Sequence, residues 1–235
     1  MPVATVYLIP TVLHEGQTDA LPAYILPVIK QCTIFFVENE RTARRYLKTL
    51  WKEMVIDDYE WQNMKERDGE VIFHFKNAVN QNKTIGIISE AGCPGIADPG
   101  QQLVMVAQEM NVPVKPLVGP NSILLALMAS GMNGQQFQFV GYLPIDSAER
   151  AKTIKTLEVE SKQKNCTQIF IETPYRNNQM MEALVKNCNP TTRLCIACEL
   201  TSAQEFVRTK TILDWKKQMP DLHKKPSIFL LLAKD

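Results

Sequence analysis

Short runs of apolar residues alternate along this chain with longer stretches in which apolar residues recur every three or four positions. The runs predict strands and the periodic stretches predict helices. The expected strands are Val3–Ile9, Thr33–Val37, Thr84–Ile88, Val112–Val118, Phe137–Leu143, Thr167–Ile171, Arg193–Cys198 and Ser227–Leu232. The expected helices are about Arg41 to Lys52, Gln101–Met110, Ile123–Ser130, Ser147–Lys164 and Arg176–Asn187. The polar and aromatic stretch Asp57–Gly69 has no clear period and is left unassigned.

The order of these elements predicts an α/β protein with two lobes in close contact. Thr84–Ile88, the helix after it and Val112–Val118 form a strand–helix–strand unit, which favours a mainly parallel sheet in the first lobe. The second half has more strands per residue, and we expect a mixed sheet there. The lobes are predicted to be residues 1–118 and 119–235. The helix Ile123–Ser130 is apolar almost all round, so we expect it to be buried.

Composition places the chain among ordinary globular proteins. It has 235 residues, 45% hydrophobic and 22% charged, and a net charge of +1. No global positive field indicates a nucleic-acid partner, although a local basic patch would be hidden in the sum. The N-terminus lacks the pattern of a signal peptide, and no apolar run reaches the roughly 18 residues of a membrane span. We therefore expect a cytoplasmic protein without membrane contact.

The six cysteines are scattered, which is typical of reduced thiols. Cys195 and Cys198 have the spacing of a metal or redox pair. They lie in a predicted strand, where positions three apart face opposite sides, and no second pair exists. We therefore expect small buried thiols and no metal site.

The segment Ser89–Gly100 leaves a predicted strand and carries three of the ten glycines and two of the fourteen prolines. Open α/β sheets bind ligands at the carboxyl ends of their parallel strands. Gly92 and Gly95 would let a ligand lie against the main chain, and Ser89 and Glu90 offer polar groups there. Asp98 could orient the turn or cap the next helix. A purely structural turn is the alternative.

A second loop, Pro116–Ser122, also ends a strand and opens a helix, so both loops are expected on adjacent strands facing one crevice. The usual dinucleotide, triphosphate and serine-hydrolase motifs are absent. Charged clusters at three other strand ends could line the same crevice or be solvated loops: Glu38–Arg41, Glu172–Arg176 and Glu199–Thr201.

Six short motifs occur in order over nearly the whole chain. They are Glu38-Asn-Glu-Arg41-Thr42, Ser89-Glu-Ala-Gly-Cys-Pro-Gly-Ile-Ala-Asp-Pro-Gly100, Pro116-Leu-Val-Gly-Pro-Asn-Ser122, Gly141-Tyr-Leu-Pro144, Glu172-Thr-Pro-Tyr-Arg176 and Ala197-Cys-Glu-Leu-Thr201. The set resembles the tetrapyrrole methylase superfamily, the third structural class of S-adenosylmethionine-dependent methyltransferases. Within it, the set is most similar to the ribosomal RNA small subunit methyltransferase I type.

The resemblance implies a homodimer of two-lobed subunits with S-adenosylmethionine in the cleft between lobes. It also implies the residues that contact this donor, which are Ser89, Gly92, Cys93, Pro94, Ile96, Ala97, Asn121, Ser122, Tyr142, Leu143 and Ala197. We hypothesise a substrate-side set of Glu38, Arg41, Glu172, Arg176 and Glu199, with no residue singled out as base.

The implied reaction is 2'-O-methylation of a ribose in small-subunit (16S) ribosomal RNA. Three positions depart from the family pattern: the segment Pro10–Gly16, the longer acid Glu90, and Tyr175 where the family has histidine. Two alternatives stay open. One is a methyltransferase of the same fold with a tetrapyrrole or other non-RNA acceptor, and the other is a donor-binding module without turnover.

Overall fold

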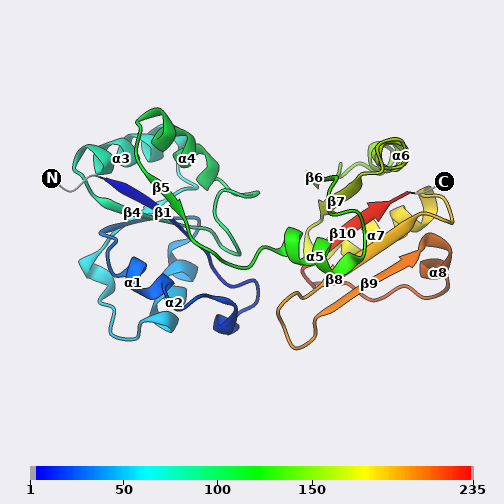
Figure 1. Ribbon diagram of the computed structural model, residues 1–235, viewed down its shortest axis with the longest axis horizontal. Coiled ribbons are helices and arrows are strands. Elements are labelled where there is room, and N and C mark those ends of the chain that lie inside the picture. The colour runs from blue at the N-terminus through cyan, green and yellow to red at the C-terminus, as the bar shows by residue number, and fades with distance from the viewer. Residues whose placement is uncertain (1–3, 234–235) are drawn as a thin grey trace. The chain divides into compact units, whose positions relative to one another are not determined.

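The computed structural model of this protein describes residues 4–233, apart from the side chain of Asp68. The chain divides into two compact units, Met1–Asn121 and Ser122–Asp235 (Figure 1). Each unit is built on a sheet of its own. The expected α/β class is therefore confirmed.

The first unit holds a five-stranded sheet within the described residues, in the order β3-β2-β4-β1-β5. Its strands are β1 (Thr5–Ile9), β2 (Ile34–Val37), β3 (Glu60–Asn63), β4 (Thr84–Ile88) and β5 (Val114–Pro116). Every pair of neighbours in it runs parallel, as predicted. All five strands consequently end at the same edge of the sheet, which we call the carboxyl edge.

Helices cover both faces of this sheet (Figure 1). On one side lie α1 (Ile25–Ile29) and α2 (Glu40–Leu50), and on the other α3 (Asp68–Asn80) and α4 (Gly100–Glu109). Two short 3-10 helices, η1 (Thr18–Ala20) and η2 (Ile56–Asp58), lie in the connections. Successive strand residues face opposite sides. Phe35 therefore packs in the α1–α2 core and Phe36 in the α3–α4 core, and both are fully buried.

The second unit holds a mixed sheet in the order β6-β7-β10-β8-β9. Its strands are β6 (Phe137–Tyr142), β7 (Thr167–Ile171), β8 (Arg193–Cys198), β9 (Phe206–Thr211) and β10 (Ser227–Leu232). The pair β6–β7 is parallel and the other neighbours are antiparallel. Helices α6 (Ser147–Lys164), α7 (Asn177–Asn187) and α8 (Ile212–Lys217) share one apolar core with the sheet. Helix α5 (Ser122–Ser130) contacts β8, β9 and β10, and η3 (Pro174–Arg176) precedes α7.

The predicted strands and helices are present, with shifts at their ends. Helix α2 begins one residue early, at Glu40, because the Asn39 side chain accepts hydrogen bonds from the first free N–H groups. The strand predicted over Val112–Val118 is shorter, only Val114–Pro116. Val3, the first residue of the first predicted strand, lies outside the described residues.

The prediction that the helix Ile123–Ser130 is buried is wrong for one face of α5. Ile123, Ala126 and Leu127 are buried, but Leu124 is 48% and Met128 78% exposed. The helix lies on the sheet through one stripe only. Helix α5 therefore has more apolar side chains than packing among the described residues buries.

The cysteines of the candidate metal pair are fully buried in β8, and burial raises the pKa of both thiols. Within residues 4–233, no group of three or more histidine, cysteine or acidic residues is placed to hold a metal ion. No described helix is both long and apolar enough to cross a membrane.

Gly86 in the centre of β4 is a position where even one methyl group should be costly. A Cβ there would lie 2.6 Å from Phe35 Cδ1 and 2.9 Å from Ile9 Cδ1, and both side chains are fully buried. We expect Gly86→Ala to lower the free energy of unfolding by about 1–3 kcal/mol through overpacking, measured by urea denaturation. Gly134→Ala is the control, since a Cβ at Gly134 meets nothing within 4 Å. Equal stability of the two variants would contradict this account of the core.

Candidate functional site

Two loops meet at the carboxyl edge of the first unit. The first glycine loop, Ser89–Gly100, follows β4, and the second glycine loop, Leu117–Asn121, follows β5. The prediction that they leave adjacent strands is wrong, because β1 lies between β4 and β5. They nevertheless converge across the end of β1. The Cys93 Sγ lies 3.6 Å from the Gly119 carbonyl oxygen and 3.5 Å from that of Pro120.

The Cys93 thiol is a hydrogen-bond donor in this contact. Burial raises its pKa, so the thiol keeps its proton at neutral pH. Gly92 approaches the same loop, since a Cβ placed there would lie 3.2 Å from the Pro120 carbonyl oxygen. The two loops thus contact each other through the Cys93 thiol and main-chain atoms. A side chain larger than glycine at position 92 would have little room at this contact.

The segment Pro10–Gly16, which continues β1, locks both loops in place. The Thr11 N–H donates to the Gly92 carbonyl at 2.8 Å. A Cβ on Gly119 would lie only 2.2 Å from Pro10 Cβ, so glycine is required there for the second loop to approach. This segment, which departs from the family pattern, therefore helps to hold the two loops together.

The first glycine loop keeps its shape through left-handed backbone and one carboxylate. Gly92, Gly95 and Ala97 have φ of +73°, +84° and +61°. The Asp98 carboxylate accepts from the Gly95 N–H at 2.9 Å and the Gly100 N–H at 2.7 Å. It thereby orients the turn at the start of α4, as predicted. Burial raises the pKa of Asp98, and the two N–H groups oppose that shift.

A charged cluster follows three neighbouring strands at this edge. The Glu38 carboxylate, after β2, accepts from the Glu90 N–H at 3.0 Å and lies 3.3 Å from Lys65 Nζ. Lys65, after β3, also lies 3.5 Å from the Glu90 carboxylate. Partial desolvation acts to lower the pKa of Lys65, but the two carboxylates outweigh it and raise the pKa above its ordinary value. Arg41 is exposed in the first turn of α2.

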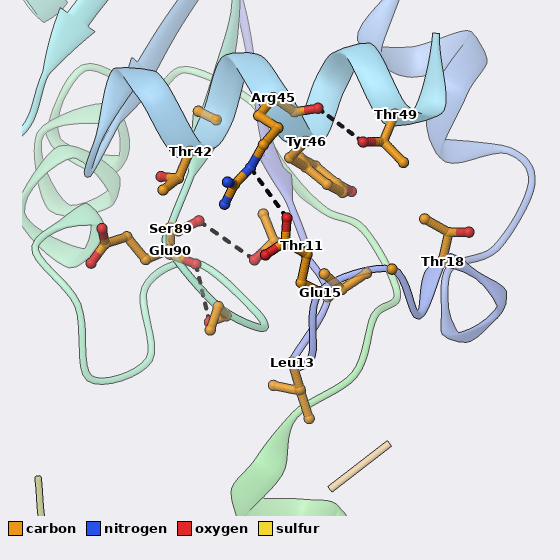
Figure 2. A pocket seen from close by; sticks show the side chains of 14 residues that line it. Thr11, Leu13, Glu15, Thr18, Thr42, Arg45, Tyr46, Thr49, Ser89 and Glu90 are labelled. Carbon is orange, nitrogen blue, oxygen red and sulfur yellow. Dashed lines mark hydrogen bonds and ion pairs between the residues drawn. The ribbon is translucent and has the colours of Figure 1, made fainter. Parts of the chain in front are cut away.

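A cavity of about 170 Å³ opens beside the start of the first glycine loop, and we call it the α2 pocket (Figure 2). Its wall is formed by α2, by the segment after β1 and by Ser89–Ala91. Its lining carries hydroxyl groups together with an exposed ion pair, Arg45 with Glu15 at 3.5 Å. The hydroxyl residues are Thr11, Thr18, Thr42, Thr49, Tyr46 and Ser89. Tyr46 Oη donates to the Pro10 carbonyl at 2.6 Å. Most of these hydroxyls already donate to main-chain carbonyl oxygens, so the lining offers hydrogen-bond acceptors to a ligand that carries hydroxyl groups of its own.

In the second unit, Glu172 and Arg176 form an ion pair in which the carboxylate is buried and the guanidinium is partly exposed. Glu172 Oε1 accepts from Arg176 Nε at 3.0 Å, Arg176 Nη2 at 2.7 Å and the Thr173 N–H at 2.6 Å. The Glu172 side chain is 0% exposed and that of Arg176 28%. Oε2 of Glu172 is buried and has no hydrogen-bond partner among the described residues. The pair fixes η3 to the end of β7.

The remaining predicted residues are spread over several elements. Glu199 has a φ of +50°, and its N–H donates to the Pro226 carbonyl at 2.9 Å. Tyr142, at the end of β6, is 61% exposed, whereas Leu143 and Ala197 are buried. Asn121 and Ser122 are half-buried where the two units join in sequence. The predicted set thus divides: Ser89, Gly92–Pro94, Ile96, Ala97 and Asn121 lie in the first unit with Glu38 and Arg41, and the others lie in the second.

The sequence profile of the tetrapyrrole (corrin/porphyrin) methylases matches residues 16–214. The chain belongs to this family. It is therefore an enzyme, an S-adenosylmethionine-dependent methyltransferase. The fold agrees, because the methyltransferase CobJ superposes with a TM-score of 0.63 at 15% identity, covering 99% of this chain and 95% of CobJ. The cobalt precorrin-4 methyltransferase CbiF gives a TM-score of 0.61 at 13% identity, covering 97% and 94%.

Curated relatives of this methylase carry the name ribosomal RNA small subunit methyltransferase I. The protein from Buchnera aphidicola subsp. Schizaphis graminum is 27% identical over 96% of this chain and 77% of its own length. That from Bacillus subtilis is 28% identical over 90% and 70%. That from Helicobacter pylori is 32% identical over 72% of this chain and 62% of its own length. The methylase thus spans about three fifths to three quarters of these relatives.

The first unit of the methylase fits the donor of its family. A Cβ at Gly95 would meet nothing within 4 Å, so main chain there is open to a ligand. Ile96 on the first glycine loop is 48% exposed and Val118 on the second is 68% exposed. Exposed apolar side chains on two converging loops are what a flat adenine ring would cover.

Sequence reasoning missed Lys65 and the residues that α2 adds to the pocket. Lys65 lies in the stretch that shows no period. Thr42, Arg45, Tyr46 and Thr49 follow the spacing i, i+3, i+4, i+7, which places them on one face of α2. That regular polar face is the signal that could have found them.

Proposed function

We propose that this methylase binds S-adenosylmethionine on the two glycine loops and methylates a ribose 2'-hydroxyl of 16S ribosomal RNA. The observation that carries the donor site is the convergence of the loops through Cys93, Gly92 and Pro120. The names of the curated relatives support the RNA acceptor. We also propose a cytoplasmic homodimer.

In this proposal the first unit positions the donor by shape more than by charge. Main chain at Gly92–Pro94 and the side chains of Ile96 and Ala97 lie along it, with Ser89 at the loop entrance. Methyl transfer from a sulfonium needs alignment and exclusion of water, and well-set geometry is worth about 7–11 kcal/mol. Asn121, Ser122, Tyr142, Leu143 and Ala197 are proposed as further contacts on the grounds of the family resemblance.

The acceptor-side roles follow from the burial of each group. Glu38 is 18% exposed at the carboxyl edge, and with Lys65 beside it we propose that it faces the acceptor hydroxyl. The α2 pocket, with its hydroxyl lining, is proposed to hold the acceptor ribose next to Ser89. Glu172 is fully buried against Arg176, so we assign this pair to positioning rather than to proton transfer. Arg41 and Glu199 complete the proposed substrate-side set.

The experiment that tests this function is methyl transfer to small ribosomal subunits from cells that lack the protein. With radiolabelled donor, we expect label in 16S RNA, and alkaline hydrolysis should leave an uncut bond at the modified nucleotide because the 2'-oxygen is blocked. Tetrapyrrole precursors, tested alongside, should gain no label. Label on a tetrapyrrole and not on RNA would overturn the acceptor. Label on a base, with normal alkaline cleavage, would overturn the ribose assignment only.

A further inference from the structure

An exposed aromatic ring lies beside a lysine and a histidine in the second unit. Tyr175, in η3, is 69% exposed. The His223 ring lies 6.1 Å from the Tyr175 ring, tilted by 75°, and Lys224 Nζ lies 5.9 Å from the Tyr175 ring centre. We call these three residues the Tyr175 platform. None of them belongs to the proposed donor or acceptor contacts.

Hydrogen bonds hold the two segments of the platform together. The Lys224 N–H donates to the Pro174 carbonyl at 2.9 Å, which ties the turn before β10 to η3. The Asn178 amide reinforces this link: its Nδ2 donates to Asp221 at 2.8 Å, and its Oδ1 accepts from the Leu222 N–H at 2.8 Å. Because these turns are held together, the Tyr175 ring should lose little conformational entropy when a ligand stacks on it.

The charge around the platform favours an anionic partner. Lys224 is exposed and Lys225 half-buried, while the nearby Arg176 is already paired with the buried Glu172. Asp221 lies in the same turn, and the hydrogen bonds from the Asn178 side chain and the His223 N–H lower its pKa. It remains ionised at neutral pH and occupied by those donors. The Lys224 ammonium is consequently the charge offered beside the ring.

We propose that the Tyr175 platform binds single-stranded RNA, with one base stacked on the Tyr175 ring and an adjoining phosphate beside Lys224. A stacked base uses the face of an aromatic ring and tolerates any sequence, while lysine supplies the attraction to the backbone. The inference rests on the proposed RNA acceptor and adds an RNA contact in the second unit. An exposed ring with an ammonium group beside it can make both contacts, whereas a buried tyrosine or an exposed tyrosine without a cationic neighbour cannot.

The test is binding of a fluorescent single-stranded oligoribonucleotide from the small-subunit RNA to the full chain, by anisotropy. Because Tyr175→Ala removes the ring on which the base stacks, we expect it to weaken binding about tenfold. Tyr175→Phe keeps the ring and should stay within about twofold of wild type. Lys224→Ala should weaken binding and make it less sensitive to salt.

Phe73→Ala is the matched control, because Phe73 is 61% exposed and its ring lies 5.7 Å from His74, in α3 of the other unit. It should bind RNA as wild type does. Wild type that binds RNA, with Tyr175→Ala unchanged, would overturn the platform and leave the proposed function intact. Wild type that binds no RNA would overturn both. Loss of self-association in Tyr175→Ala without loss of RNA binding would identify a contact between copies and also overturn the inference.

Discussion

Gly92→Val should abolish binding of the methyl donor while the protein still folds. Gly92 has a φ of +73°, which valine strongly disfavours. A Cβ there already lies 3.2 Å from Leu13 Cδ2 and 3.2 Å from the Pro120 carbonyl oxygen, before the two valine methyl groups are added. The glycine loops must then separate. Holding valine in this conformation costs about 1–3 kcal/mol and the loops must also separate, so we expect donor affinity to fall about 100-fold or more. Calorimetry with S-adenosylmethionine and S-adenosylhomocysteine measures it.

The control for this loss is Gly134→Val, since Gly134 has open space around it and ordinary φ. Both variants should give the circular dichroism of a folded α/β protein, and only Gly92→Val should lose donor binding. Gly92 is buried, but it lies in the loop between β4 and α4 and not in a strand or helix, so we expect the strain to lower stability by about 1–3 kcal/mol without unfolding the unit. A folded Gly92→Val that binds the donor as wild type does would remove the glycine loops from the donor site.

Apolar pattern predicted the interior strands well because they are buried on both faces. The residues of β2, β8 and β10 are almost entirely buried, and each reads as a continuous apolar run. The elements that were missed lack such a run. Strand β3 is Glu-Trp-Gln-Asn at the edge of its sheet, and β9 is a half-exposed edge strand. Helices α1, α3 and α8 were not assigned either. Edge strands stay in place through backbone pairing, which leaves little trace in side-chain pattern.

The candidate site was predictable where the chemistry is local and not where it depends on strand order. Left-handed backbone at Gly92 and Gly95, and the turn held by Asp98, follow from residue types within one loop. That the two glycine loops meet across β1 depends on long-range pairing, as do the contacts of Pro10 and Thr11. The exposed face of α5 shows the same limit. An apolar sequence indicates what prefers burial, not what the chain finally covers.

Arg176→Met should strongly destabilise the second unit. It would leave the fully buried Glu172 carboxylate with only the Thr173 N–H donating to it, since its other oxygen already has no hydrogen-bond partner among the described residues. Removing one partner of a buried ion pair costs about 3–5 kcal/mol, and we expect about 3 kcal/mol because Arg176 is partly exposed. Urea denaturation at neutral pH measures the change.

A second substitution and an exposed pair separate the charge effect from simple loss of contacts. Glu172→Gln combined with Arg176→Met removes the uncompensated charge, so it should recover part of the lost stability. The pair Glu40–Arg44 has the same i, i+4 spacing at 2.6 Å but is 37% and 40% exposed, and the Arg44 guanidinium also lies 5.0 Å from the Trp61 ring centre, so Arg44→Met should cost about 1 kcal/mol. Equal losses for Arg176→Met and Arg44→Met, or no recovery in the double variant, would show that the buried carboxylate is not what requires Arg176.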